Sequence, residues 1–92
     1  MAHAVQDNAE RNRYEIIVDG EIAFATYERD GDTLAITHTF TPPALRGKGV
    51  AADMVAGLLD DARARGLKIR PVCSYVVTYF ERHPDQRDLL AV

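Results

Sequence analysis

Seven residues near the middle of the chain, residues 45–51, most constrain what it can fold into. Segments with the alternation of β-strands precede them, and a segment with helical periodicity follows. Gly47 and Gly49 lack a Cβ, so the backbone can adopt positive φ and approach a ligand closely. Arg46 and Lys48 add two positive charges beside a predicted helix N-terminus, where unpaired N–H groups attract anions. The stretch therefore predicts a phosphate or pyrophosphate cradle, with an ordinary turn carrying two solvated cations as the alternative.

Two common phosphate-binding motifs are excluded by spacing. A Walker A loop requires Lys and then Ser or Thr after its second glycine, but Val50 follows Gly49. The dinucleotide-binding fingerprint requires a third glycine, where this chain has Ala52, together with a parallel strand before the loop and an acidic residue after it. The spacing of Arg46, Gly49 and Ala51 fits Arg-x-x-Gly-x-Ala instead.

Composition limits the classes of protein to consider. A chain of 92 residues with 47% hydrophobic residues predicts one small globular domain. The net charge of −3 gives no electrostatic basis for binding nucleic acid, and the apolar runs are too short to span a membrane. No signal peptide is apparent, and the single cysteine favours a reducing compartment. We therefore expect a cytoplasmic protein without a nucleic-acid or membrane partner, and without a zinc site.

The first half of the chain predicts a tail and three antiparallel strands. Residues 1–12 are polar and aperiodic, which predicts a flexible tail before a single domain over residues 13–92. Strands are expected at residues 14–19, 21–28 and 33–41, joined by turns at Asp19-Gly20 and at residues 30–32. Alternation along the third strand places four side chains on one face: Leu34, Ile36, His38 and Phe40.

The second half predicts helices around a further strand. An apolar stripe indicates a helix over residues 48–65, with Gly66 as its C-terminal cap. Residues 67–73 form a strand that a helical crossover makes parallel to the third strand. Ser74 is expected to cap a second helix over residues 75–82, and Leu89 and Leu90 to pack back onto the domain.

The predicted fold class is mixed α/β with the order β-β-β-α-β-α. An antiparallel three-stranded meander joins a parallel βαβα unit. Ligands of such sheets lie beyond the carboxyl ends of the parallel strands, which here end near residues 40–41 and 72–73. This topology places the glycine loop, His38 and Cys73 in one neighbourhood.

Four segments in this order resemble the small, single-domain Gcn5-related N-acetyltransferases. They are His38-Thr39 on the third strand, Arg46-Gly47-Lys48-Gly49 in the loop, Pro71-Val72-Cys73-Ser74-Tyr75 before the last helix, and Arg82-His83-Pro84 at its end. The resemblance covers residues 13–90. It implies an acetyl-CoA-dependent transfer of acetyl to a primary amine, with no metal.

The resemblance also implies where acetyl-CoA binds. Backbone N–H groups of Gly47, Lys48, Gly49, Val50 and Ala51 are expected to hold the pyrophosphate, with Arg46 and Lys48 supplying charge. The main chain of Thr39, Phe40 and Thr41 is expected to pair with the pantetheine arm. Larger family members insert helices between their first two strands and build the acceptor site from them. Because Asp19-Gly20 closes that connection here, the acceptor groove should be open and suit a protein or peptide amine.

Three residues are candidate catalytic groups. Cys73 precedes a helix N-terminus, which lowers the pKa of a thiol, so it is a nucleophile, an acid–base group or a small buried hydrophobe. His38 is a general base or a core histidine. Aligning the last helix places Phe80 where larger members have an acid tyrosine, so Tyr79 or Tyr75 is the substitute. The alternative functions are a CoA-binding module without catalysis and a cysteine-dependent thioester hydrolase using Cys73 and His38.

Overall fold

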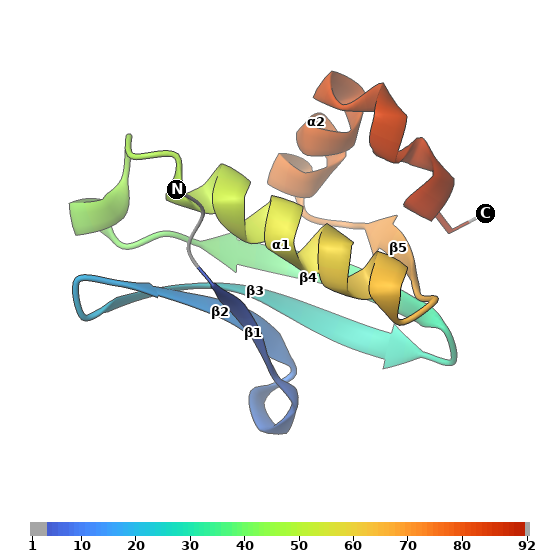
Figure 1. Ribbon diagram of the computed structural model, residues 1–92, viewed down its shortest axis with the longest axis horizontal. Helices are drawn as coiled ribbons and strands as arrows, with labels where there is room; N and C mark the ends of the chain where they lie inside the picture. The colour runs from blue at the N-terminus through green and yellow to red at the C-terminus, as the bar shows by residue number, and fades with distance from the viewer. Residues whose placement is uncertain (1–3, 92) are drawn as a thin grey trace.

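A computed structural model describes residues 4–91 and contains one five-stranded sheet with the strand order β1-β2-β3-β4-β5. Strands β1 to β4 are antiparallel, and β5 is parallel to β4 (Figure 1), so the predicted mixed α/β class is confirmed. The strands and helices are β1 (Val5–Asn8), β2 (Arg13–Val18), β3 (Glu21–Asp30), β4 (Thr33–Phe40), α1 (Val50–Ala64), β5 (Lys68–Pro71) and α2 (Ser74–Arg82). Short 3-10 turns occur at Ala9–Arg11, Pro43–Leu45 and Pro84–Leu89.

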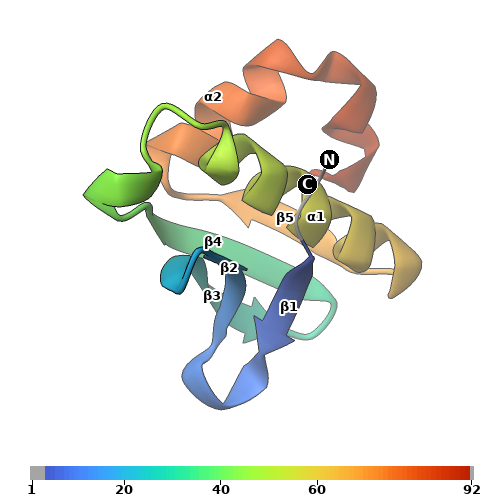
Figure 2. The same cartoon turned by 60° about the vertical axis from the view of Figure 1, so that its left-hand side comes forward.

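Both α-helices lie on the same side of the sheet. Helix α1 crosses the sheet, and α2 packs beside it near β5, while the opposite face carries no helix within residues 4–91 (Figures 1 and 2). The two-residue turn at Asp19-Gly20 leaves no chain between β2 and β3 to cover that face; both residues have positive φ, at 52° and 79°. No helix of the described residues is long and apolar enough to span a membrane.

The core forms between α1 and the sheet. Strand β3 turns Ala23 and Ala25 toward the helices, and its larger side chains Ile22 and Phe24 lie on the open face. Small side chains beneath α1 let the helix lie close to the sheet. The buried side chains of α1 are Val50, Met54, Val55, Leu58, Leu59 and Ala62.

A β-bulge in β4 contradicts the prediction that Leu34, Ile36, His38 and Phe40 share one face of the strand. Tyr27 pairs with Ile36 but Thr26 pairs with His38, so Thr37 has no partner of its own on β3. The extra residue breaks the alternation of side chains. Leu34 and Ile36 are buried, whereas His38 and Phe40 are exposed. The prediction that all four share one face is therefore wrong.

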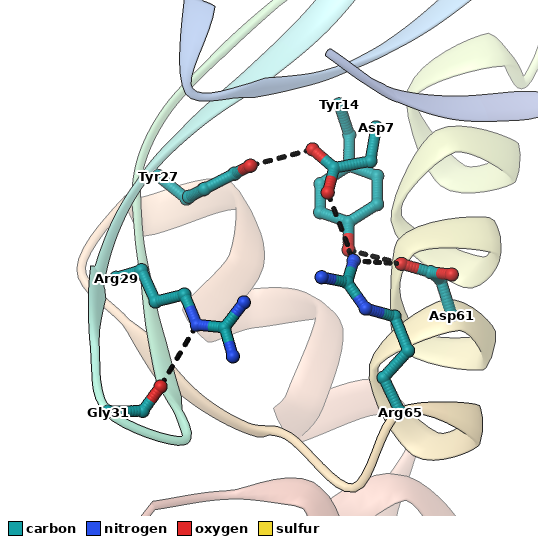
Figure 3. A network of polar contacts seen from close by, with 7 residues as sticks. All are labelled: Asp7, Tyr14, Tyr27, Arg29, Gly31, Asp61 and Arg65. Atoms are coloured by element: carbon teal, nitrogen blue, oxygen red, sulfur yellow. Dashed lines mark hydrogen bonds and ion pairs between the residues drawn. The ribbon is translucent and has the colours of Figure 1, made fainter. Parts of the chain in front are cut away.

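The structure also differs from the predicted tail, because residues 5–8 form β1 at the sheet edge. Asp7 of β1 accepts a hydrogen bond from the Tyr27 hydroxyl at 2.6 Å and from Arg65 of α1 at 3.0 Å (Figure 3). Asp61 joins the same network through Arg65 and Tyr14. Burial and the hydrogen bond to Asp7 raise the pKa of Tyr27 to about 12, so its hydroxyl remains a donor at neutral pH. Residues 1–3 of the predicted tail lie outside the described part.

Gly66 ends α1 as predicted. It has φ of 71°, its N–H donates to the Arg63 carbonyl at 3.3 Å, and the Leu67 N–H donates to the Ala62 carbonyl at 2.8 Å. This pair of bonds is the Schellman motif, which satisfies carbonyls at the helix end. The chain then turns directly into β5, which runs parallel to β4 as predicted. Leu89 is buried, and Leu90 bridges to Ile69, so the expected packing of this segment is confirmed.

We predict that Gly57→Ala destabilises the protein, although alanine is the better helix former. A Cβ on Gly57 would lie 2.4 Å from Cγ2 and 2.8 Å from Cβ of Val5, so α1 and β1 would be forced apart. Urea denaturation should give a free energy of unfolding lower by about 1–3 kcal/mol, and Val5→Ala should restore part of it in the double variant. A more stable Gly57→Ala variant would contradict this packing.

Candidate functional site

The glycine loop, residues 45–51, connects β4 to α1. Leu45 is buried and anchors one end of the loop. Gly47 and Gly49 have φ of 79° and 75°, in the left-handed region that other residues seldom adopt. A Cβ at either position would meet no atom within 4 Å, so glycine is favoured by backbone conformation and not by lack of space. The sequence therefore fixes the conformation of the loop through two glycines.

The loop leaves backbone donors free at the start of α1. Gly49 is the N-cap residue, and the first intrahelical bond runs from the Asp53 N–H to the Gly49 carbonyl at 3.0 Å. The N–H groups of Val50, Ala51 and Ala52 precede that bond and have no partner in the helix. No side chain caps this end of α1. The helix dipole adds a positive potential there, so the chemistry of this end suits an anion.

The two basic residues of the loop differ in their surroundings. Arg46 donates from Nε to the Thr41 carbonyl at 3.1 Å, which fixes the loop to the end of β4. Within residues 4–91 its two terminal nitrogens have no hydrogen-bond partner. Lys48 is exposed and does not line the hollow beside the loop.

A hollow of about 240 Å³ lies between the glycine loop and Tyr75 of α2. Of the residues that the sequence predicts to bind a cofactor, Thr39, Phe40 and Lys48 do not line it. The lining residues are Thr41, Leu45, Arg46, Gly47, Gly49, Val50, Ala51, Ala52 and Tyr75.

A second hollow of about 140 Å³ continues along α2 and shares Ala52 and Tyr75 with the first. Arg82 lines it, and so do the stacked rings of Tyr79 and His83, whose centroids are 4.0 Å apart. From the sequence, Arg82 is only part of the family-like segment at the end of the last helix and has no predicted role in the site. A detectable signal existed, because Tyr75, Tyr79 and Arg82 recur at helical spacing on one face of α2.

Strands β4 and β5 separate beside this hollow. Their pairing ends at Ile36 and Pro71, where the Ile36 carbonyl accepts hydrogen bonds from both Val72 and Cys73, at 3.1 and 2.9 Å. Beyond this point Thr39 faces the gap, with its hydroxyl oxygen 3.5 Å from the Cys73 sulfur. The gap places the thiol between the carboxyl ends of two parallel strands, as the topology predicts.

Cys73 is the N-cap residue of α2, in place of the predicted Ser74. Partial burial raises the pKa of its thiol, but hydrogen bonds from the Thr39 hydroxyl and from the backbone N–H groups of Tyr75, Val76 and Thr39 outweigh burial. The pKa of Cys73 therefore lies below its ordinary value. Several donors directed at one sulfur favour the thiolate, which is the nucleophilic form.

His38 does not join this group. It is exposed and pairs with Thr26 on the open face of the sheet, whereas the neighbouring Thr39 points toward Cys73. Within the described residues no hydrogen bond joins His38 to Cys73. The predicted neighbourhood of the loop, His38 and Cys73 therefore does not hold for His38. Cys73 lines neither hollow, but Tyr75, whose N–H donates to its sulfur, lines the hollow beside the loop.

The tyrosine candidates of α2 have different positions. Tyr75 is exposed and lines both hollows, and burial raises the pKa of Tyr79, which lines only the second. Phe80, at the position of the family's acid tyrosine, is buried in the core. Residues 4–91 contain no cluster of His, Cys, Asp or Glu that could hold a metal ion.

Comparison with known proteins decides the family. Residues 13–89 match the sequence profile of the GCN5-related N-acetyl-transferase family. This chain belongs to that family. It is 28% identical to the protein NATD1 of Xenopus tropicalis, over 91% of each chain. It is also 28% identical to NATD1 of Mus musculus, over 87% of this chain and 76% of the mouse protein.

A solved structure supports the same fold. The solution structure of a GCN5-like protein from Staphylococcus aureus superposes with a TM-score of 0.74 and 25% sequence identity. The superposition covers 98% of this chain and 89% of the other. The resemblance drawn from the four sequence segments is therefore confirmed at the level of family and fold.

We predict that the Cys73 thiol reacts at lower pH than the thiol of an unstructured cysteine peptide, because its pKa is lowered. The rate of alkylation by iodoacetamide, measured against pH, should have a lower midpoint for the protein than for the peptide. Thr39→Val removes one hydrogen bond to the sulfur and should move the midpoint upward. Thr37→Val is the matched control, because Thr37 bonds Thr26 and not Cys73. Equal midpoints for Thr39→Val and the unaltered protein would contradict the assignment.

Proposed function

We propose that this family member transfers the acetyl group of acetyl-CoA to a primary amine. The observation that carries the proposal is the position of Cys73, whose thiol faces the gap between β4 and β5, while the nearby Tyr75 lines the hollow at the anion-attracting start of α1. A pyrophosphate and a reactive thioester belong to the same molecule, so a site for acetyl-CoA requires both features close together. The family membership favours the same reaction.

The glycine loop binds the pyrophosphate in this proposal. Backbone N–H groups of residues 47–51 donate to its oxygens, and the terminal nitrogens of Arg46 add charge-assisted hydrogen bonds. Lys48 contributes long-range attraction from an exposed position. The second hollow, with Arg82 and the stacked Tyr79 and His83, receives the remaining nucleotide portion.

The separated strands receive the pantetheine arm. Pairing between β4 and β5 ends at Ile36, so the main chain of residues 39–41 has no partner on β5 and can pair with an extended ligand there. The ligand would share this edge with two existing contacts, from the Thr39 N–H to the Cys73 sulfur and from Arg46 to the Thr41 carbonyl. The amides of the arm and the N–H and C=O groups of a strand are complementary hydrogen-bonding partners. This arrangement directs the thioester to the part of the gap that holds Thr39 and Cys73.

Cys73 then acts as the first acceptor of the acetyl group. Its thiolate attacks the thioester carbonyl, a new sulfur–carbon bond forms, and the bond to the CoA sulfur breaks to release the CoA thiolate. The neutral amine next attacks acetyl-Cys73, the amide bond forms, and the amine proton passes to the departing cysteine sulfur or to water. The Thr39 hydroxyl stabilises the thiolate before and after transfer. Within residues 4–91 no hydrogen bond joins His38 or Tyr79 to Cys73, so neither is given a step here.

Calorimetric titration tests whether the protein binds acetyl-CoA through the glycine loop. Acetyl-CoA and desulfo-CoA should both bind saturably, and Arg46→Ala should weaken binding by about 1–3 kcal/mol, the value of a charge-assisted phosphate contact. Arg11→Ala is the matched control, because Arg11 is an exposed arginine in the turn after β1, away from the loop. Undiminished affinity of Arg46→Ala would contradict the assignment of Arg46.

Intact-mass measurement tests whether Cys73 accepts the acetyl group and passes it to an amine. Incubation with acetyl-CoA should add one acetyl group to the protein, and an amine should then remove it. Cys73→Ala should lose the adduct while its affinity for desulfo-CoA stays within a few-fold. If Cys73→Ala transfers acetyl to an amine at the unaltered rate, the cysteine has no part in the reaction. If the acetyl-enzyme is hydrolysed and no amine is acetylated, the protein is a thioester hydrolase instead.

A further inference from the structure

An apolar patch lies on the sheet face opposite the helices. Ile17 of β2 and Ile22 of β3 are directly paired, and Phe24 of β3 is paired with Phe40 of β4, with ring centroids 5.4 Å apart. Ile17, Ile22 and Phe40 are 57%, 39% and 38% exposed. Two neighbouring pairs of this kind form one continuous surface, which we call the open-face patch.

The described chain leaves this patch uncovered. Both helices lie on the other side of the sheet, and the turn at Asp19-Gly20 adds nothing over β2 and β3 (Figures 1 and 2). An uncovered sheet face with several large apolar side chains is typical of a contact surface.

The open-face patch lies close to the gap between β4 and β5. Phe40 faces the patch, while Thr39, its neighbour on β4, faces the Cys73 sulfur on the other side of the strand. Adjacent strands lie about 5 Å apart, so a molecule on the patch is separated from the gap by one strand. Because β4 and β5 are no longer paired beyond Ile36, an amine carried by such a molecule can reach the gap from the open face, between the two strands.

The charge near the patch indicates what kind of molecule it attracts. Residues 13–30, which form the hairpin of β2 and β3, include two basic residues, Arg13 and Arg29, and five acidic residues: Glu15, Asp19, Glu21, Glu28 and Asp30. Arg13 is already engaged, with Nε 2.6 Å from Glu15 and its guanidinium 4.4 Å from the centre of the Phe24 ring. The hairpin is therefore an acidic border of an apolar surface, which suits a cationic ligand with apolar groups.

We propose that the open-face patch docks the acetyl acceptor, a lysine-bearing segment of another protein with apolar side chains beside the lysine. The inference rests on the proposed acetyl transfer and adds the class of the acceptor. A second copy of the chain fits this surface poorly, because a twofold contact would place two acidic hairpins against each other. An anionic membrane surface is repelled by the same charges.

The test uses a fluorescent synthetic peptide with one lysine flanked by leucines, and fluorescence polarisation without any cofactor. Ile22→Thr and Ile17→Thr, each checked for folding by circular dichroism, should bind the peptide about tenfold more weakly. Val77→Ala is the matched control, because Val77 of α2 is 37% exposed but lies off the patch. A peptide with serines in place of the leucines, and one with norleucine in place of the lysine, should also bind weakly.

Two results would overturn the proposal. The first is equal binding of the leucine-flanked peptide to both threonine variants and to the unaltered protein. The second is sedimentation of a dimer that Ile22→Thr dissociates, since the patch would then join two copies of the chain. A failure of the docking proposal can be distinguished from a failure of the proposed acetyl transfer, because acetyl-CoA binding is measured separately. The affinity of Ile22→Thr for acetyl-CoA should equal that of the unaltered protein. If acetyl-CoA does not bind but the protein still prefers the leucine-flanked lysine peptide, the docking surface is supported and the proposed acetyl transfer is contradicted.

Discussion

The divergence of β4 and β5 after Ile36 is the feature on which the rest of the site depends. One carbonyl, that of Ile36, accepts the N–H groups of both Val72 and Cys73, and the parallel ladder ends there. The bulge at Thr37 lies on the same part of β4 and sets which side chains face the gap. Together they turn Thr39 toward Cys73 and His38 away from it. If the β4–β5 ladder continued regularly to Phe40, the gap would close. The backbone N–H and C=O groups of β4 would then pair with β5 and could not bind a ligand.

The two faces of the sheet carry different chemistry. On the helix side, the start of α1 offers unpaired N–H groups and two basic residues, which suit an anion. On the other side, the hairpin of β2 and β3 offers carboxylates around an apolar patch, which suit a cation. In the proposed acetyl transfer, this separation attracts the anionic donor and the cationic amine to different sides of the sheet. The short turn at Asp19-Gly20 is what leaves the second side open.

Sequence reasoning found the features that depend on local chemistry. The loop glycines, the turn at Asp19-Gly20 and the cap at Gly66 each require a backbone conformation that few residues adopt, so their residue types are informative. The bulge gave no such signal, because residues 34–40 alternate regularly and Thr37 is an ordinary strand residue. The strand β1 was missed because the partners of Asp7 lie far along the chain, at Tyr27 and Arg65. Ser74 is the better capping residue by propensity, but the end of β5 places Cys73 at the cap.

The central claim is that the gap between β4 and β5 and the glycine loop bind one ligand. Amide chemical-shift mapping of the isotopically labelled protein with desulfo-CoA tests it most directly, because it reports each backbone N–H separately. The account predicts large shifts for the amides of Gly47, Gly49, Val50 and Ala51 together with Thr39, all with the same dissociation constant. Shifts confined to other parts of the protein, or separate dissociation constants for the loop and for Thr39, would contradict it.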